Sequence, residues 1–299
     1  MYYSLALVVV TAIWGWTFVV VHGAAQEYGV LSFLAVRFAI ATAAIAPFSL
    51  RNWSVRAAGI GAGIGVVLAC AYLLMTFGLV KSTPTNTGLI TGLFVVFAPI
   101  LNRLLFGVAA NRLFWLAVGV SLIGLFLLSA NGGNTDDPTW SGDLLSVCGA
   151  AALGLHIALL DRYAKGIEST VLATAQLGSA AATLVAVRLI VGGMKEGNAV
   201  AWPSPSVWFA LFQSALLATA LGFYVQTLAQ RHLPAVRIAV ILTVAPVFAA
   251  LFGWLLAGDR LTARQICGAV LIVAALGLAE IYPQLRRELT ARRIRGSKP

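Results

Sequence analysis

Polar side chains inside long apolar segments are the residues of this chain that could do chemistry. His156 lies in the middle of one such segment, and Thr17 lies in the middle of another. Two further i, i+4 pairs each place an aromatic ring and a hydroxyl on one helix face: Tyr72 with Thr76, and Phe223 with Thr227. Such groups offer aromatic surface and a few hydrogen bonds. They suit the binding of an uncharged or zwitterionic molecule with a hydrophobic side chain.

A catalytic centre is not expected. An enzyme embedded in a membrane needs a clustered nucleophile, an acid–base pair or a set of metal ligands. The chain has only three His residues, and its ten Asp and Glu residues are almost absent from the middle of the apolar segments. We therefore expect no enzyme, no catalytic residue and no metal site.

The composition indicates an integral membrane protein. The 299 residues are 60% hydrophobic and only 10% charged, whereas soluble domains carry about 25% charged residues. Apolar runs of about 20 residues predict transmembrane helices, and the runs are too long and too uniform for barrel strands. We expect ten spans, at 2–22, 30–50, 57–80, 84–107, 112–130, 141–160, 168–192, 206–230, 234–257 and 263–283.

One membrane hairpin occurs twice in the chain. The segment from Pro84 to Leu128 resembles the segment from Pro234 to Glu280. The sequence alignment pairs Pro84 with Pro234, Pro99 with Pro246, and Asn111-Arg112-Leu113 with Asp259-Arg260-Leu261. Because five spans is an odd number, two five-span halves point in opposite directions. The expected architecture is all-helical, with inverted repeats at 1–130 and 141–283 around a central cavity and a basic tail at 284–299.

The repeat alignment selects the residues expected at the cavity. It places Thr17 opposite His156, Tyr72 opposite Phe223, and Thr76 opposite Thr227. Thr87, Thr91 and Phe94 lie along one side of span four. The expected substrate-binding set is Trp14, Thr17, Tyr72, Thr76, Thr91, Phe94, His156, Phe223, Tyr224 and Thr227. Two alternatives stay open: each Thr could bond to its own helix backbone, and Trp14 and Tyr224 could serve core packing.

Prolines and glycines inside the spans have two interpretations. Pro99 and Pro246 lie inside spans four and nine, so they are expected to act either as static kinks or as a pair of hinges. In span three, Gly59 with Gly63 and Gly61 with Gly65 form small-xxx-small pairs, which predict close helix packing.

Loop charges predict that both ends of the chain lie in the cytoplasm. Most loop Lys and Arg residues then lie inside, at Arg51, Arg56, Arg103, Arg112, Arg162, Lys165, Arg231, Arg237 and the tail from Arg286 to Lys298. The outer side holds Lys81, Lys195, Arg260 and Arg264, together with Asp136 and Asp137. Arg37 and Arg188 fall inside spans. Either could snorkel outward, and Arg37 could instead bind a substrate carboxylate.

The chain resembles a drug/metabolite transporter of the EamA type, close to the bacterial aromatic amino acid exporters. The residues that carry the resemblance are Trp14-Gly15-Trp16-Thr17-Phe18, Arg37-Phe38, Gly142-Asp143-Leu144-Leu145, Leu233-Pro234-Ala235, Ala245-Pro246-Val247-Phe248, Gly258-Asp259-Arg260-Leu261-Thr262, Gln265 and Gly268. The resemblance implies ten helices, export of small metabolites and no cofactor.

These observations together predict an exporter of small hydrophobic metabolites in the bacterial inner membrane, with aromatic amino acids among its substrates. We expect a small-molecule substrate and the lipid bilayer as partners and no nucleic acid, while the oligomeric state, a monomer included, stays open. His156 is expected to bind by hydrogen bonds, so that the substrate gradient drives transport. The alternatives are proton-coupled drug or metabolite efflux and metabolite exchange within the same superfamily.

Overall fold

The part of the chain that the structure describes is helical. The computed structural model describes residues 2–49, 53–82, 84–108, 112–129, 140–195, 202–233, 235–242, 244–256, 262–264 and 266–275. These residues contain helices and turns and no β-strand, which confirms the helical fold class. The predicted turn at Gly258-Asp259-Arg260, Asp136, Asp137 and the tail at 284–299 lie outside the described residues.

The helices follow the apolar segments of the sequence closely. The first half contains α1 (Tyr2–Tyr28), α2 (Val30–Ile45) with the short η1 (Ala46–Phe48), α3 (Val55–Val80), α4 (Pro84–Thr91), α5 (Phe94–Phe106) and α6 (Arg112–Ser129). The second half contains α7 (Trp140–Tyr163), α8 (Ser169–Lys195), α9 (Pro205–Phe212), η3 (Gln213–Leu221), α10 (Gly222–Gln230), α11 (Ala235–Leu242), α12 (Ala245–Leu256) and a helix at Ile266–Ala275.

Six helical stretches of the described residues are long and apolar enough to cross a membrane. They are Tyr2–Tyr28, Val30–Phe48, Val55–Val80, Ser141–Tyr163, Ser169–Val191 and Pro205–Gln230. The shorter apolar helices are Phe94–Phe106, Ala245–Leu256 and Ile266–Ala275. The total of ten spans and the inverted repeat stay predictions.

Local signals explain where several helices begin. The Ser54 hydroxyl accepts a hydrogen bond from the Ala57 N–H at 3.1 Å at the start of α3, and Ser204 does the same for Val207 before α9. Gly29 joins α1 to α2 with a φ of 82°, a conformation that glycine adopts without a steric penalty. This single residue lets α2 reverse direction directly after α1.

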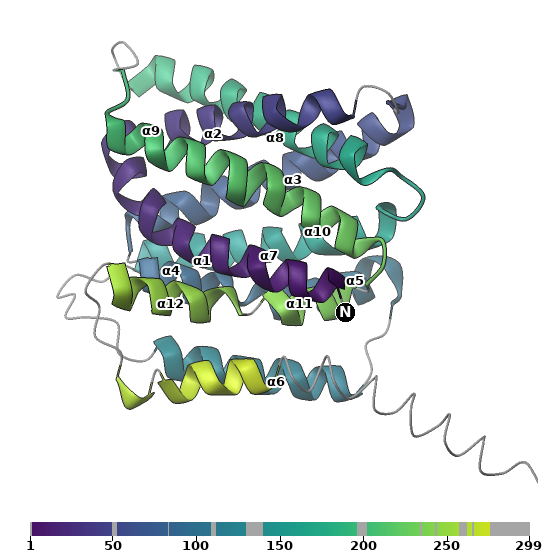
Figure 1. The fold of residues 1–299 in the computed structure, drawn as a ribbon, viewed down its shortest axis with the longest axis vertical. Helices are drawn as coiled ribbons and strands as arrows, with labels where there is room; N and C mark the ends of the chain where they lie inside the picture. The colour runs from purple at the N-terminus through teal and green to yellow at the C-terminus, as the bar shows by residue number, and fades with distance from the viewer. Residues whose placement is uncertain are drawn as a thin grey trace, which may run out of the picture.

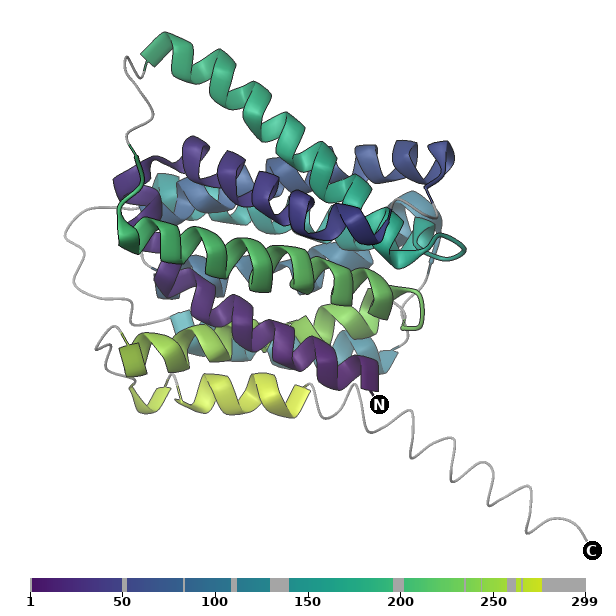
Figure 2. The same cartoon turned by 45° about the horizontal axis from the view of Figure 1, so that its top comes forward.

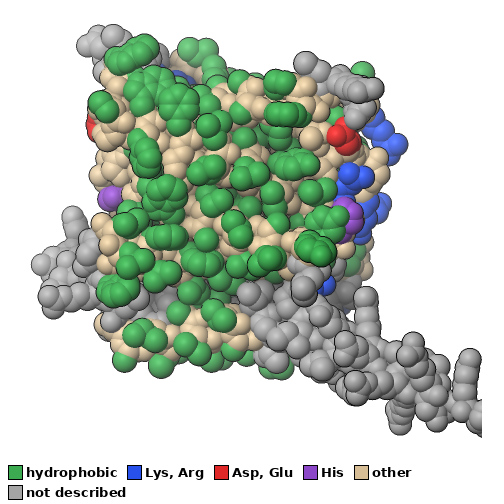
Figure 3. Space-filling model, viewed as in Figure 1, with side chains coloured by type: hydrophobic (Ala, Val, Ile, Leu, Met, Phe, Trp, Pro, Cys, Tyr) green, Lys and Arg blue, Asp and Glu red, His purple; other side chains and the backbone are tan. Residues whose placement is uncertain are grey.

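The helices run side by side through the molecule. In Figures 1 and 2 they form a stack with α8 at one edge, and α6 and the helix at Ile266–Ala275 at the other. The long helix α3 packs against both α7 and α8, while α1 packs against α12 and α5 against α7. Figure 3 shows one outer face covered largely by hydrophobic side chains, with most of the visible Lys and Arg near one edge and His at two opposite edges. That distribution fits a body surrounded by lipid with polar ends.

Two helical segments are interrupted in the same way. The Leu93 carbonyl, between α4 and α5, accepts from the N–H groups of Val96 and Phe97 at 2.9 and 3.2 Å. The Val244 carbonyl, between α11 and α12, accepts from those of Val247 and Phe248 at 3.0 and 3.2 Å. Leu93 therefore corresponds to Val244, and Phe97 to Phe248.

This register corrects the pairing of Pro99 with Pro246. Pro246 is the second residue of α12, where a missing N–H breaks no helical bond. Pro99 lies about one turn deeper, inside α5. The interruptions therefore come before both prolines, at Gly92–Leu93 and at Val244, and the hinge role of the prolines stays a prediction.

Glycines bring α1 and α7 onto the interrupted helices. A Cβ atom added at Gly15 of α1 would lie 2.6 Å from the Cβ of Phe248, and one added at Gly154 of α7 would lie 2.6 Å from the Cβ of Phe97. Such distances are too short for any side chain larger than hydrogen. The crossing of α1 on α12 and the crossing of α7 on α5 thus involve the corresponding residues Phe248 and Phe97.

The glycines of α3 separate into two sets. Gly61 and Gly65 face α8, where an added Cβ at Gly65 would lie 2.8 Å from the Cβ of Ser179 and would overlap the carbonyl oxygen of Gln176. Nothing lies within 4 Å of a Cβ added at Gly59 or Gly63. Only the Gly61/Gly65 pair therefore serves close packing of helices.

We predict that Gly65→Ala destabilises the protein while Gly63→Ala does not. The new methyl group at residue 65 must displace α8, and overpacking of this kind costs roughly 1–3 kcal/mol. The matched change at residue 63 enters open space and should leave the stability unchanged or raise it by up to about 1 kcal/mol, because alanine favours a helix over glycine. Thermal unfolding of the purified proteins in one detergent measures both, and equal midpoints would contradict the α3–α8 packing.

Candidate functional site

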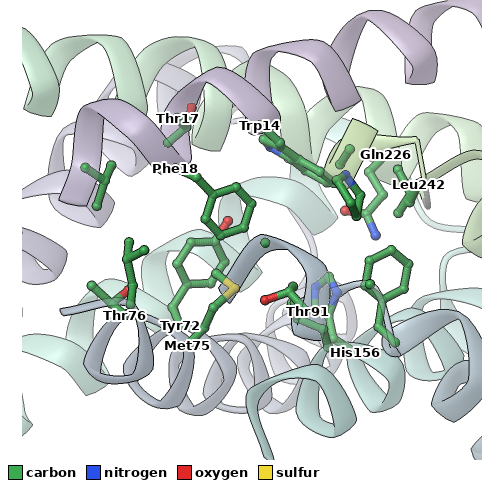
Figure 4. Close-up of a pocket in the computed structure, with 18 of the residues that line it drawn as sticks. Trp14, Thr17, Phe18, Tyr72, Met75, Thr76, Thr91, His156, Gln226 and Leu242 are labelled. Atoms are coloured by element: carbon green, nitrogen blue, oxygen red, sulfur yellow. The ribbon is translucent and has the colours of Figure 1, made fainter. Parts of the chain in front are cut away.

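A cavity of about 80 Å³ lies between the two halves of the chain (Figure 4). It is bordered by α1, α2, α3, the α4–α5 segment, α7, α10 and the α11–α12 segment. Its polar and charged lining residues are Thr17, Arg37, Tyr72, Thr76, Thr91, His156 and Gln226. The apolar and aromatic lining residues include Trp14, Phe18, Met75, Phe94, Leu153, Phe223 and Leu242.

Phe223 of α10 organises the aromatic wall of this cavity. Its ring centroid lies 5.7 Å from that of Trp14, 5.9 Å from that of Tyr72 and 5.6 Å from that of His156. These are separations at which aromatic rings attract each other edge to face. Four rings from α1, α3, α7 and α10 therefore form one continuous aromatic surface.

Most of the residues selected from the sequence meet at this cavity. Its lining includes Trp14, Thr17, Tyr72, Thr76, Thr91, Phe94, His156 and Phe223. Thr227 is fully buried beside the cavity, behind Phe223 in the hydrogen-bond chain described below. Tyr224 instead lines a separate surface groove with Ala44 and Leu216, because the next residue along a helix points to another side. That these residues bind a substrate stays a prediction.

A buried hydrogen-bond chain fixes the orientation of His156. The Thr227 hydroxyl donates to the Phe223 carbonyl at 2.6 Å, so it must accept from the Gln176 amide N–H, which lies 2.9 Å away. The Gln176 carbonyl oxygen then faces Nε2 of His156 at 2.8 Å. A carbonyl oxygen only accepts. His156 therefore carries a proton on Nε2, and in the neutral ring Nδ1 is an acceptor.

Three buried polar atoms at the cavity have no partner among the described residues. They are Nδ1 of His156, Oε1 of Gln226 and Oγ1 of Thr91. In Figure 4 these three side chains lie in the same half of the view. Unpaired buried polar groups are costly unless water or a ligand satisfies them, so this part of the cavity is suited to a ligand that donates hydrogen bonds. Gln226 was missed from the sequence, although its position three residues after Phe223 places both on one helix face.

Arg37 lies at the cavity and does not snorkel. Only 3% of its surface is exposed, and its Nε donates to the hydroxyl of Thr219 at 2.8 Å. The expectation of an outward-reaching side chain is wrong for Arg37, because η3 and the Tyr72 ring hold the guanidinium inside the bundle. Arg188 is half-buried, and its Nε donates to the hydroxyl of Ser32 at 2.9 Å.

The π-helical segment η3 makes hydrogen bonds with three cavity-lining residues of other helices, which are Trp14, Thr17 and Arg37. The N–H of Gly222 reaches the carbonyl of Leu217, which leaves the Ala218 carbonyl to accept from the indole Nε1 of Trp14 at 2.7 Å. Gln213, at the start of η3, donates to Thr17 at 3.2 Å. Together with the bond from Arg37 to Thr219, these contacts fix α1 and α2 to one segment.

We predict that Trp14→Phe lowers stability, whereas Trp16→Phe leaves it nearly unchanged. Phenylalanine keeps most of the ring contact with Phe223 but leaves the Ala218 carbonyl without its donor, at a cost of about 1 kcal/mol. Trp16 contacts Phe209 by ring packing alone in the described contacts, so it is a matched control. Urea or thermal unfolding in detergent measures the difference, and an unchanged Trp14→Phe midpoint would mean that the indole bond adds nothing.

Comparison with known proteins relates this sequence to transporters. The model of the EamA-like transporter family matches residues 1–130 and 140–280. An "Uncharacterized transporter" of Archaeoglobus fulgidus is 31% identical over 276 residues, which cover 92% of this chain and 85% of that protein. The "Uncharacterized transporter YoaV" of Bacillus subtilis is 22% identical over 279 residues, covering 91% of this chain and 94% of the relative.

A solved structure titled "Crystal structure of protein" shares the fold. It superposes with a TM-score of 0.75 over 94% of this chain and 97% of that chain. The sequences are 16% identical, so this likeness concerns the fold alone.

Proposed function

Because this chain belongs to the EamA-like transporter family, whose members carry small molecules across membranes, we propose that it exports small hydrophobic metabolites, aromatic amino acids among them. The observation that carries the proposal is the central cavity, which combines an aromatic wall with a few polar groups. An apolar side chain would lie against Trp14, Tyr72 and Phe223. A donor on the ligand, such as an ammonium or a ring N–H, would meet His156, Gln226 and Thr91.

The proposed mechanism is alternating access between two inverted five-helix repeats, at 1–130 and 141–283, within ten membrane spans. Support comes from the corresponding glycine crossings, Gly15 on Phe248 and Gly154 on Phe97. The interrupted segments α4–α5 and α11–α12 lie beside these crossings. Bending at Gly92–Leu93 and at Val244, which precede Pro99 and Pro246 along the chain, would open the cavity to one side and then to the other.

The proposed orientation places both termini in the cytoplasm of a bacterial inner membrane. Arg56, Arg162 and Lys165, all expected inside, line one common pocket together with Glu168. Positive loop charges mark the cytoplasmic side. The proposed cytoplasmic surface is therefore the one formed by the start of α3, the end of α7 and the start of α8.

We predict that Thr76→Trp blocks transport. Thr76 lines the cavity and is 3% exposed, so an indole there would fill the space that the substrate needs. Val66 lies on the same helix and is 49% exposed, so Val66→Trp is the matched control. Transport of labelled phenylalanine in proteoliposomes should fall at least about tenfold for Thr76→Trp, a loss equivalent to about 1.4 kcal/mol, and stay normal for Val66→Trp. Wild-type rates in a folded Thr76→Trp protein would exclude this cavity as the pathway.

We also predict that the substrate's own gradient drives transport. A proton-coupled carrier needs a titratable group whose proton affinity differs between the two states. Among the described lining residues, His156 is the one whose side chain ordinarily titrates near neutral pH. Its Nε2 proton is committed to Gln176, which favours a hydrogen-bonding role.

Counterflow and net flux in proteoliposomes, with and without an imposed pH gradient, test this prediction. Equal net flux under both conditions is expected, together with full counterflow. Accumulation of a neutral amino acid against its gradient, driven by the pH step and lost in His156→Ala, would contradict the proposal. That result would favour the proton-coupled alternative.

A further inference from the structure

Arg37 is a cation inside the membrane-spanning part of the bundle. It lies near the middle of α2, is 3% exposed and lines the central cavity. A charged side chain inside a membrane span is costly, and such residues usually face a partner or a pathway. Its surroundings should therefore contain a compensating group.

The described protein groups compensate Arg37 only in part. Its Nε donates to Thr219, and its guanidinium also makes a side-chain hydrogen bond with Tyr72. The central guanidinium carbon lies 5.0 Å from the Tyr72 ring centroid and 6.0 Å from that of Phe38. Hydroxyl groups and aromatic rings stabilise a cation, but these carry no negative charge.

Acidic side chains within the described residues lie elsewhere. Glu27 is exposed at the end of α1. The remaining ones contact other groups: Asp143 accepts from Ser82, Asp161 from Asn102, and Glu168 from Thr170. Among the described residues, therefore, no carboxylate neutralises Arg37.

Contacts within the protein orient the Arg37 side chain. The Thr219 hydroxyl donates to the Ser214 carbonyl at 2.9 Å, so its lone pairs face Nε of Arg37. With Nε on Thr219 and a further side-chain hydrogen bond to Tyr72, the guanidinium still has other N–H donors for a carboxylate. The ring of Tyr72 lies beside the guanidinium and limits its movement on that side.

We infer that Arg37 binds the carboxylate of the transported molecule, so that the substrates are carboxylates with an apolar body. The inference rests on the proposed transport through this cavity and narrows its substrate class. The carboxylate completes the charge balance of Arg37, and the apolar body lies along Tyr72 and Phe223. An ammonium group is not required by this contact.

Three ligands that each contain one phenyl ring distinguish the contribution of the carboxylate to binding from that of the ammonium. Phenylalanine carries both charged groups, 3-phenylpropionate only the carboxylate, and phenethylamine only the ammonium. Binding to the purified full-length protein is measured by isothermal titration in one detergent. The wild type should bind phenylalanine and 3-phenylpropionate at least about tenfold more tightly than phenethylamine. Their carboxylate forms a charge-assisted pair with Arg37, whereas phenethylamine offers only a charge of the same sign as Arg37.

The variants test whether Arg37 causes this preference. Arg37→Gln should bring the affinities for phenylalanine and phenethylamine to within about twofold, and Arg37→Lys should keep part of the preference because it keeps the charge. Arg188→Gln is the matched control, because Arg188 is also an arginine inside a helix but its side chain does not line the cavity. It should keep the wild-type ratio. A purely structural role of Arg37 would weaken all three ligands alike.

The outcomes distinguish this inference from the proposed function. Equal wild-type binding of phenylalanine and phenethylamine, unchanged in a folded Arg37→Gln protein, would overturn the carboxylate site and leave amino acid export standing. Binding of 3-phenylpropionate without phenylalanine would support the site and overturn amino acid export. If Arg37→Gln does not fold, the Arg37→Lys ratio decides, and an unchanged ratio there counts against the inference. Binding of none of the three ligands would overturn both.

Discussion

The geometry of the cavity depends on one widened helical segment, η3 at Gln213–Leu221. In a regular α-helix the carbonyl of Ala218 would accept from the N–H of Gly222. Here that N–H reaches Leu217, and the released carbonyl accepts from Trp14 instead. A Cβ at Gly222 would lie 2.9 Å from the indole nitrogen, so only glycine fits. The change from α-helix to π-helix in this segment thus fixes the position of Trp14, which belongs to the aromatic wall of the cavity.

The rest of the cavity relies on small residues at helix crossings. Helices in lipid gain little from hydrophobic association, so close packing and hydrogen bonds must hold them together. Gly15 and Gly154 let α1 and α7 approach the interrupted helices closely enough for their neighbours, Trp14 and Leu153, to line the same cavity. The two helix interruptions, at Leu93 and Val244, add peptide groups that lie outside regular helical hydrogen bonding.

The sequence predicted the helices and most of the cavity because both follow from periodicity and composition. Apolar run length locates the spans, and i, i+4 spacing identifies the Tyr72–Thr76 face. The sequence could not show that the Arg37 side chain is buried at the cavity. Its burial depends on Thr219, which lies in a π-helical segment that has no sequence signature. The pairing of Pro99 with Pro246 failed because proline was used as the anchor, whereas the backbone bonds of Leu93 and Val244 define the register.

The two halves of the chain also differ at the position of Arg37, the charged residue among those that line the cavity. Under the proposed repeat, the register that pairs Gly15 with Gly154 pairs Arg37 with Gln176. The later register that pairs Leu93 with Val244 pairs Tyr72 with Phe223. The cation and phenol ring of the first half are therefore replaced by a neutral amide and a plain ring in the second. Gln176 uses its amide within the protein, between His156 and Thr227. A duplicated cavity with two arginines would suit a dianion. With a single one, the electrostatics favour one carboxylate, held at the Arg37 side, with the neutral acceptors of His156 and Gln226 left for a donor on the same ligand.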